Sequence, residues 1–238
     1  MQPPSEACAV LTAAGSGSRL GCEAPKALVE ISGRPLLWWA ARGLRAGGVG
    51  TIVVTAPASF LVDFRAALAE FDDVAVVAGS DRSRQASVAL GLEALGERDP
   101  DAVVLVHDAA RPLTPPEVTD RVIDAVRAGA GAVIPVLPVT DTLKTVDASG
   151  AVVGTPRRSD MVAVQTPQGF RWDVLIRAHE AGASLGADEA AAATDDAGLV
   201  EAIGGSVQTV AGDELSLKVT RPLDLALAQI LVAEETSS

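Results

Sequence analysis

The sequence has no tyrosine, only 3 % aromatic residues and two cysteines among its 238 residues. Nucleic acids are held by basic surfaces and by aromatic rings that stack on bases, so this scarcity and the net charge of −12 argue against a nucleic-acid partner. Two cysteines cannot build a disulfide framework or a four-cysteine zinc site. The longest apolar runs are strand-sized and fall short of the ~20 residues of a membrane span, so we expect no membrane partner.

What the chain does contain is typical of a folded globular protein. Hydrophobic residues make up 48 % of it, and the mean hydropathy is +0.30. Its length suits one large domain, and we predict a single domain over residues 1–238. The first residues lack the basic region and the apolar segment of a secretory signal, so we expect a cytoplasmic protein.

The segment 10–37 organises the rest of the chain. It begins inside a buried strand and enters a loop that contains Gly15, Gly17 and Gly21, together with Arg19 and Lys26. Glycine has no Cβ, so backbone N–H groups in such a loop can approach an anion closely. The two cations suit a polyphosphate, and the segment therefore predicts a nucleoside triphosphate site.

Three other interpretations of this loop fit less well. A Walker A loop needs a lysine directly after a glycine, which is absent here. A Rossmann dinucleotide loop needs G-x-G-x-x-G and an acidic residue after the second strand, but the spacing is G-x-G-x-x-x-G and that strand ends Thr55-Ala56-Pro57. A simple glycine turn would explain the glycines but not the two cations.

Apolar segments alternate with helical ones along most of the chain. The expected strands cover residues 7–13, 28–31, 51–55, 74–78, 102–106, 132–136, 163–165, 207–210 and 215–219. The expected helices cover residues 35–44, 59–71, 85–95, 115–128, 172–181, 195–203 and 222–233, and T-P-Q-G-F (166–170) is expected to be a loop. This alternation predicts an α/β fold, a three-layer α/β/α sandwich with a mostly parallel, Rossmann-like sheet.

One segment, at about 139–159, breaks the alternation. It reads as two short strands around the turn Asp147-Ala148-Ser149-Gly150. An isolated hairpin is only marginally stable in water, so this β-arm should pack against something. A second copy of the chain is the economical partner, and folding back on its own domain is the alternative.

A second group of candidate residues follows the expected strand 102–106, in His107-Asp108-Ala109-Ala110-Arg111-Pro112. Ligands of such sheets bind at the carboxyl ends of the strands. A carboxylate there, beside a phosphate loop, suits Mg²⁺, so Asp108 is the predicted metal residue; a helix cap or turn is the alternative. Arg111 can hold a phosphate through two hydrogen bonds. His107 is expected to orient the loop, and His179 to be structural.

Together, the glycine loop with R-L-G and P-K, the H-D-A-A-R-P, the D-T-x-K, the T-P-Q-G-F and the L-x-L-K-V-T-R-P-x-D-L resemble the 2-C-methyl-D-erythritol 4-phosphate cytidylyltransferases. These motifs extend over nearly the whole chain, in the family's order. The resemblance implies a nucleotidyltransferase of the non-mevalonate isoprenoid pathway that uses Mg²⁺, CTP and a polyol phosphate, and that forms a homodimer through the β-arm. A ribitol-5-phosphate cytidylyltransferase is the near alternative, and an inactive nucleotide-binding regulatory domain is the alternative of another class.

The resemblance also implies roles for individual residues. Arg19, Lys26 and Lys218 would be catalytic, and Arg19 and Lys26 would hold the α-phosphate. Residues around the cytidine and its phosphates would be Ala13, Ala14, Gly15, Gly17, Ser87 and Asp108. Residues that bind the substrate would be Arg111, Thr142, Arg158, Thr166 and Lys218, with Thr142 and Arg158 supplied by the arm of the other subunit.

The sequence departs from this family at one loop. The family usually shows G-G-x-x-R-x-x-[ST]-V, whereas Ser80 and Asp81 stand here where the glycine pair would be. The backbone of the base-reading loop is therefore expected to differ in shape. Arg157 and Arg158 are adjacent, so either could be the arm contact.

Overall fold

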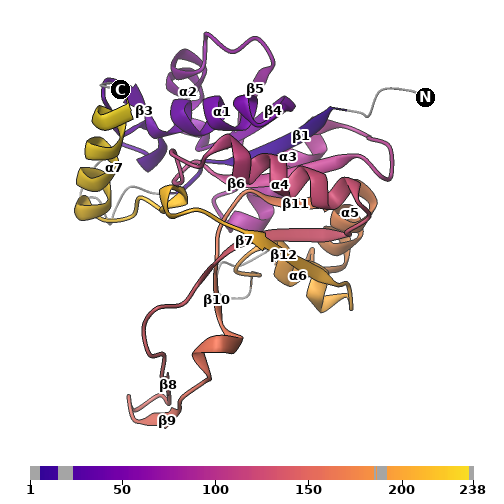
Figure 1. Ribbon diagram of the computed structural model, residues 1–238. Coiled ribbons are helices and arrows are strands. Elements are labelled where there is room, and N and C mark those ends of the chain that lie inside the picture. The colour runs from indigo at the N-terminus through magenta and orange to yellow at the C-terminus, as the bar shows by residue number, and fades with distance from the viewer. Residues whose placement is uncertain (1–5, 16–23, 185, 187–191, 236–238) are drawn as a thin grey trace.

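An eight-stranded sheet forms the centre of the computed structural model, which describes residues 6–15, 24–184, 186 and 192–235 (Figure 1). The strand order is β10-β7-β11-β6-β1-β4-β5, and β12 also pairs with β7. The strands are β1 (Ala7–Thr12), β4 (Val49–Ala56), β5 (Val74–Ala78), β6 (Val103–Asp108), β7 (Ala132–Pro138), β10 (Val162–Val164), β11 (Gln168–Arg171) and β12 (Val207–Ala211). β1 is parallel to β4 and β6, whereas β10 and β11 run antiparallel to their neighbours.

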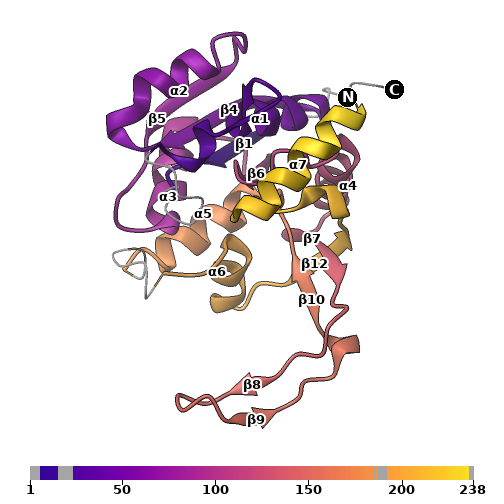
Figure 2. The same cartoon turned by 90° about the vertical axis from the view of Figure 1, so that its left-hand side faces the viewer.

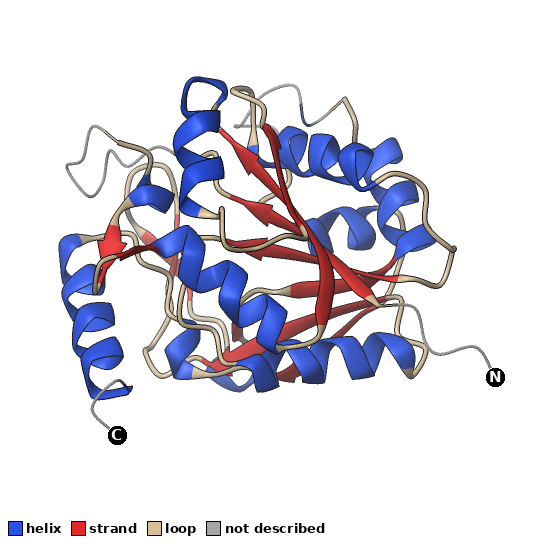
Figure 3. Cartoon of the chain, turned by 90° about the horizontal axis from the view of Figure 1, so that it is seen from above, coloured by secondary structure: helices blue, strands red, loops and turns tan. Residues whose placement is uncertain are grey.

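Helices cover both faces of the sheet, as Figure 3 shows from above. One face carries α1 (Leu36–Ala46), α2 (Leu61–Ala67) and α4 (Pro116–Arg127), and the other carries α3 (Arg84–Leu95), α5 (Trp172–Ala181) and α6 (Asp196–Ala202). Successive residues of a strand point to opposite faces. Leu11 accordingly joins the apolar cluster under α1, whereas Val10 joins the cluster under α3. The predicted three-layer α/β/α sandwich is confirmed.

The C-terminal helix α7 (Pro222–Glu235) lies outside these layers. It packs with Ile31, Leu36 and Trp39 in a third, smaller apolar cluster. Ile31 belongs to a two-residue strand, β2 (Glu30–Ile31), which pairs with β3 (Arg34–Pro35). No helix within the described ranges is long and apolar enough to cross a membrane.

The T-P-Q-G-F segment is not the loop that we expected. Its last three residues begin β11, which lies between β6 and β7 in the sheet. Proline and glycine are turn residues in most sequences, so the segment has the composition of a loop. Here Gly169 has a packing role: a Cβ at this position would come within 2.3 Å of Val122 Cγ1 on α4.

Other expected boundaries also differ. Residues 215–219 do not form a strand; a 3-10 helix, η6 (Glu214–Ser216), replaces its first part, because the Asp213 carboxylate accepts a hydrogen bond from Leu215 N at 2.8 Å. The strand expected at 28–31 is shortened to β2, since η2 (Lys26–Leu28) occupies its start. The helix expected at 59–71 is divided into η3 (Ala58–Phe60) and the shorter α2.

The expected β-arm is present as a hairpin of β8 (Thr145–Val146) and β9 (Val152–Gly154). Asp147 closes its turn by accepting hydrogen bonds from Ser149 N and Ala151 N at 2.9 and 3.1 Å. The hairpin extends well away from the sheet in both Figure 1 and Figure 2. It therefore does not fold back onto its own domain.

Candidate active site

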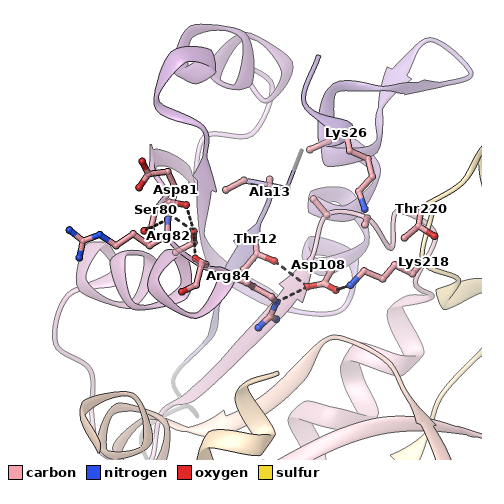
Figure 4. Close-up of a pocket in the computed structure, with 17 residues that line it drawn as sticks. Thr12, Ala13, Lys26, Ser80, Asp81, Arg82, Arg84, Asp108, Lys218 and Thr220 are labelled. Atoms are coloured by element: carbon pink, nitrogen blue, oxygen red, sulfur yellow. Dashed lines mark hydrogen bonds and ion pairs between the residues drawn. The ribbon is translucent and has the colours of Figure 1, made fainter. Parts of the chain in front are cut away.

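A cavity of about 610 Å³ opens at the carboxyl ends of β1 and β6. Its walls come from the end of β1, the start of η2, the loop before α3, the end of β6 and the segment 218–220. Figure 4 shows Asp108 at its centre, with Arg84 on one side and Lys218 on the other. This is the edge at which ligands bind in parallel α/β sheets.

Asp108 is the last residue of β6 and is 7 % exposed. Its Oδ2 lies 2.7 Å from Lys218 Nζ, and its Oδ1 lies 3.3 Å from Arg84 Nε. Thr12 Oγ1, from the neighbouring strand β1, lies 3.2 Å from the same Oδ1. The carboxylate is thus fixed from both sides by cations.

The charges around Asp108 determine the protonation state of its carboxyl group. Burial would raise the pKa of Asp108, but Arg84 and then Lys218 outweigh that effect and hold the pKa well below its usual range. Burial would lower the pKa of Arg84, but Asp196 and Asp108 raise it instead. Asp108 is therefore a carboxylate and Arg84 a guanidinium cation at neutral pH.

Arg84 has a second carboxylate partner outside the cavity wall. Its NH1 lies 2.7 Å from Asp196 Oδ2, and Asp196 Oδ1 lies 2.9 Å from His179 Nε2. Asp196 is 1 % exposed, and its pKa is lowered because Arg84 and His179 outweigh its burial. One guanidinium therefore joins the carboxylates of Asp108 and Asp196. His179, expected to be structural, belongs to this network.

His107 and Thr166 hold the backbone on which Asp108 lies. Asp108 N donates to Thr166 Oγ1 at 3.1 Å, and this hydroxyl lies 2.8 Å from His107 Nδ1. Burial lowers the pKa of His107 to about 4, so the imidazole is neutral at pH 7. The network then assigns a hydrogen bond from the Thr166 hydroxyl to Nδ1 and one from Nε2–H to the Arg111 carbonyl at 3.3 Å. The expectation that His107 orients the loop agrees with these contacts.

Serine side chains form hydrogen bonds within the loop 80–83 and between this loop and the first turn of α3. Ser87 Oγ accepts a hydrogen bond from Ser80 N at 3.0 Å and lies 3.1 Å from the Ser83 carbonyl. Ser80 Oγ accepts from Arg82 N at 3.1 Å. Ser80 and Asp81, which stand in place of the expected glycine pair, both line the cavity. In Figure 4 the Arg82 side chain points away from Asp108.

The arrangement favours a polyanionic ligand. Lys26, Lys218 and Arg84 all line a cavity whose central carboxylate is Asp108, in a chain of net charge −12. The residues also fit a divalent cation that takes most of its ligands from a bound polyphosphate, because Mg²⁺ needs only one or two protein carboxylates there. Among the described residues no three His, Cys, Asp or Glu side chains form a complete metal cluster.

Comparison with known proteins identifies the family. The family model described as 2-C-methyl-D-erythritol 4-phosphate cytidylyltransferase matches residues 7–234. The chain belongs to this family. A relative of that name from Rhodococcus jostii (strain RHA1) is 48 % identical over 227 residues, which cover 95 % of each chain. Another, from Frankia casuarinae, is 51 % identical over 225 residues, which cover 94 % of this chain and 80 % of the relative.

Solved structures of this family have the same fold. The synthase of 4-diphosphocytidyl-2C-methyl-D-erythritol from Anaerococcus prevotii aligns with a TM-score of 0.80 at 28 % identity, over 96 % of this chain and 98 % of that one. The 2-C-methyl-D-erythritol 4-phosphate cytidylyltransferase from Thermus thermophilus aligns with a TM-score of 0.74 at 36 % identity, over 94 % and 98 % of the chains.

The structure brings many of the predicted site residues of this family member to the cavity. Those that line it are Ala13, Ala14, Gly15, Lys26, Ser87, Asp108 and Lys218. Gly17 and Arg19 lie outside the described residues. Thr142 and Arg158 lie on the exposed arm and are not among the residues that line the cavity, and Arg158 NH1 donates to the Thr140 carbonyl at 2.8 Å.

Two residues that are predicted to bind the substrate, Arg111 and Thr166, contact other parts of the protein in this structure. Arg111 donates to the carbonyls of Ser216 and Val164 at 2.6 and 3.2 Å, and burial lowers its pKa. Thr166 is buried, and its hydroxyl is engaged with His107 and the Asp108 backbone. Both residues therefore support the loop around Asp108 in this structure. Their contact with substrate stays a prediction.

Sequence reasoning missed the functional place of Arg84 and Asp196. Arg84 was given no role there, and Asp196 falls within the expected helix 195–203, also without a role. One signal was available for Arg84, which is the first residue of α3. The loop before this helix follows the end of a strand, and a cation there faces the edge of the sheet at which ligands bind. Asp196 lies over 100 residues further on, and no local pattern pairs the two.

Proposed function

We propose that the chain transfers CMP from CTP to 2-C-methyl-D-erythritol 4-phosphate and releases pyrophosphate. The observation that carries the proposal is that the family match extends over residues 7–234, on a chain whose cationic cavity contains Lys26 and Lys218. The relatives and solved structures that bear this activity in their names cover nearly the whole chain. The two alternatives, a ribitol-5-phosphate cytidylyltransferase and an inactive regulatory domain, are not favoured.

In the proposed reaction, an oxygen of the polyol phosphate attacks the α-phosphorus of CTP. The new P–O bond forms as the bond to the β-phosphate oxygen breaks, and the electron pair leaves with pyrophosphate. Negative charge gathers on the α-phosphoryl oxygens, so fixed cations lower the barrier more than they strengthen substrate binding. Lys26, with Arg19, would hold these oxygens. The attacking phosphate is already ionised, and no side chain is needed as general base.

We also propose that Mg²⁺ acts with the nucleotide and that Asp108 is its protein ligand. Its carboxylate stays ionised, and Thr12 and Arg84 orient it at the cavity floor. When bound, the cation would neutralise phosphate charge during the transfer. In this structure the Lys218 ammonium forms an ion pair with Asp108 Oδ2. When the substrate binds, the ammonium would turn from this carboxylate toward the substrate phosphate.

The active form is proposed to be a homodimer in which each arm completes the site of the other subunit. Three exposed valines of the arm support this: Val146, Val152 and Val153 are 58–64 % exposed. Exposed apolar patches commonly mark protein interfaces. Thr142 and Arg158 of one copy would then reach the polyol phosphate in the cavity of its partner. The expected cytoplasmic location stays a prediction.

Pyrophosphate release tests the reaction directly. The purified chain is supplied with CTP and Mg²⁺, and with methylerythritol phosphate or ribitol 5-phosphate in parallel. Turnover with methylerythritol phosphate alone is expected. Turnover with ribitol 5-phosphate alone would assign the near alternative, and no turnover with either would favour an inactive nucleotide-binding domain.

Mixed dimers test the composite site. Lys26→Ala would inactivate a site from within its own chain, whereas Arg158→Ala would impair the site of the partner. Since a heterodimer of the two then keeps one intact site, unfolding and refolding an equal mixture should restore about a quarter of the wild-type sites. Arg157→Ala, the adjacent change, is the matched control for Arg158→Ala and should not reduce activity on its own. If the mixture is no more active than its components, the composite site is refuted.

A further inference from the structure

We propose that Asp196 is a positioning residue for the reaction: it holds the Arg84 guanidinium in the orientation that fixes the Asp108 carboxylate in the cavity. The inference deepens the proposed function and rests on it for its kinetic test. Its basis is the sequence of contacts from Asp196 to Arg84 at 2.7 Å, from Arg84 to Asp108 at 3.3 Å and from Asp108 to Lys218 at 2.7 Å.

Because the Arg84 guanidinium is planar, its contact with Asp196 determines which nitrogen faces Asp108. Arg84 uses NH1 for Asp196 and Nε for Asp108. A guanidinium is a planar fork, so the position of one N–H determines where the others point. With Asp196 in place, Nε is presented to Asp108 Oδ1. Without it, the guanidinium can rotate toward Asp108 with its terminal nitrogens, or toward a bound polyphosphate.

Both ends of the Arg84–Asp196 pair have fixed backbones. Arg84 begins α3 directly after Ser83, whose hydroxyl accepts a hydrogen bond from Ala86 N at 3.0 Å. Asp196 begins α6 directly after Asp195, whose carboxylate accepts from Gly198 N at 3.0 Å. Side-chain caps of this kind hold the first turn of a helix. The guanidinium therefore lies between the capped N-termini of α3 and α6 and the last residue of β6.

The start of α6 has a further anchor that does not use Asp196. Gln168 on β11 donates to Asp195 Oδ2 at 2.7 Å and accepts from Ala197 N at 3.1 Å. The helix is therefore held to the sheet on both sides of Asp196. The Asp196 carboxylate is therefore not needed to hold the start of α6 to the sheet, and its Oδ2 pairs with Arg84 instead.

Burying a carboxylate costs free energy unless it is paired and hydrogen-bonded. Replacing a buried ion pair by apolar groups is often neutral or stabilising, so the pair between Arg84 and Asp196 is weak evidence of a stability role. A role in positioning explains why a charge is kept there: a charged partner holds the guanidinium against the attraction of an incoming triphosphate.

The test compares Asp196→Asn with Asp195→Asn. In the first variant the asparagine keeps the size of the aspartate side chain but loses its charge, so it holds the Arg84 guanidinium less strongly. Misplacement of a catalytic group by about 1 Å can cost about 10²-fold in rate, and we expect kcat to fall by roughly 10- to 100-fold. The KM for CTP should stay constant or fall, because Arg84 becomes available to the triphosphate. Asp195→Asn keeps the cap of α6, because asparagine caps as well as aspartate, but its amide nitrogen would face the Gln168 donor. This control should therefore lower the melting temperature but keep kcat.

A double-mutant cycle with Arg84→Lys decides whether Asp196 acts through Arg84. Lysine keeps the charge but loses the fork, so Asp196→Asn should have little further effect on kcat in that background. Additive losses would overturn the proposal, as would an Asp196→Asn variant with wild-type kcat.

A wild-type protein that releases no pyrophosphate would instead refute the proposed function. In that case a crystal structure of Asp196→Asn still decides the positioning role. Retention of the contact between Arg84 Nε and Asp108 would overturn it, and a rotated guanidinium would support it.

Discussion

Lys218 Nζ lies 2.7 Å from Asp108 Oδ2, at the opposite end of the carboxylate from Arg84. Asp108 ends a central strand, whereas Lys218 lies in a segment near the C-terminal helix, 110 positions later in the chain. This ion pair joins the sheet to the 218–220 segment across the cavity. It places an ammonium beside a carboxylate that Arg84 also holds, at the edge where the substrates are proposed to meet.

Lys218→Ala should raise the KM for CTP and lower kcat. Without the ammonium, the buried Asp108 carboxylate loses one of the two ion pairs that it forms among the described residues, and its negative charge opposes the incoming triphosphate. Loss of one stabilising group of this kind costs about 10²-fold in kcat. Steady-state pyrophosphate release measures both constants, and an unchanged KM for CTP would contradict the electrostatic argument.

Lys26→Ala should behave differently, because Lys26 is proposed to contact the α-phosphate as charge develops there. We expect turnover to fall by roughly 10²–10³-fold with a smaller effect on CTP affinity, the pattern of a transition-state contact. CTP affinity is measured by calorimetry and kcat by pyrophosphate release. Arg177→Ala, an exposed change on α5, is the control. A loss confined to affinity, at constant kcat, would exclude this role.

Arg158→Ala should raise the KM for the polyol phosphate by roughly 10- to 100-fold, since a charge-assisted hydrogen bond is worth about 1.5–3 kcal/mol. The KM for CTP should change less. The adjacent Arg157 pairs with Asp160 at 2.8 Å and provides the matched control. If Arg157→Ala gives the larger effect on the polyol phosphate, the arm contact belongs to Arg157.

The α/β architecture could be predicted because its strands are continuous apolar runs with strong local signals. Strand β11 could not, because its partners β6 and β7 are distant in sequence and its residues Gln168 and Gly169 have no strand preference. The same limit applies to the site. Lys26 and Asp108 lie in recognisable motifs, whereas the link from Arg84 to Asp196 exists only once α3 and α6 pack on the same face of the sheet.

Acid should destabilise the protein through His107. The pKa of its imidazole falls from 6.5 to about 4 on folding because the ring is buried. Between these two pH values the unfolded chain binds more protons than the folded one, so stability decreases as the pH falls from 6.5 to about 4. The full loss is about 3 kcal/mol. Urea unfolding at a series of pH values measures the slope.

His107→Gln should flatten this slope, because glutamine offers the same acceptor and donor to Thr166 and Arg111 without titrating. Thr114→Ala is the control: Thr114 Oγ1 contacts the same Arg111 carbonyl at 3.3 Å, and its loss weakens the loop without removing an ionisable group. That variant should be less stable at every pH but keep the wild-type slope. An unchanged slope in His107→Gln would assign the acid sensitivity to other groups.

Gly169→Ala should destabilise the fold through close packing rather than backbone strain. The new methyl group would come within 2.3 Å of Val122 Cγ1 and 3.1 Å of Leu105 Cδ2, so α4 must move away from the sheet. Overpacking of this kind typically costs about 1–3 kcal/mol. Gly131→Ala is the matched control, because its methyl group would meet Val174 Cγ2 at an ordinary 3.5 Å. Urea unfolding should therefore separate the two variants, and equal stabilities would show that α4 can shift without cost and that the glycine at 169 is not required for its packing on β11.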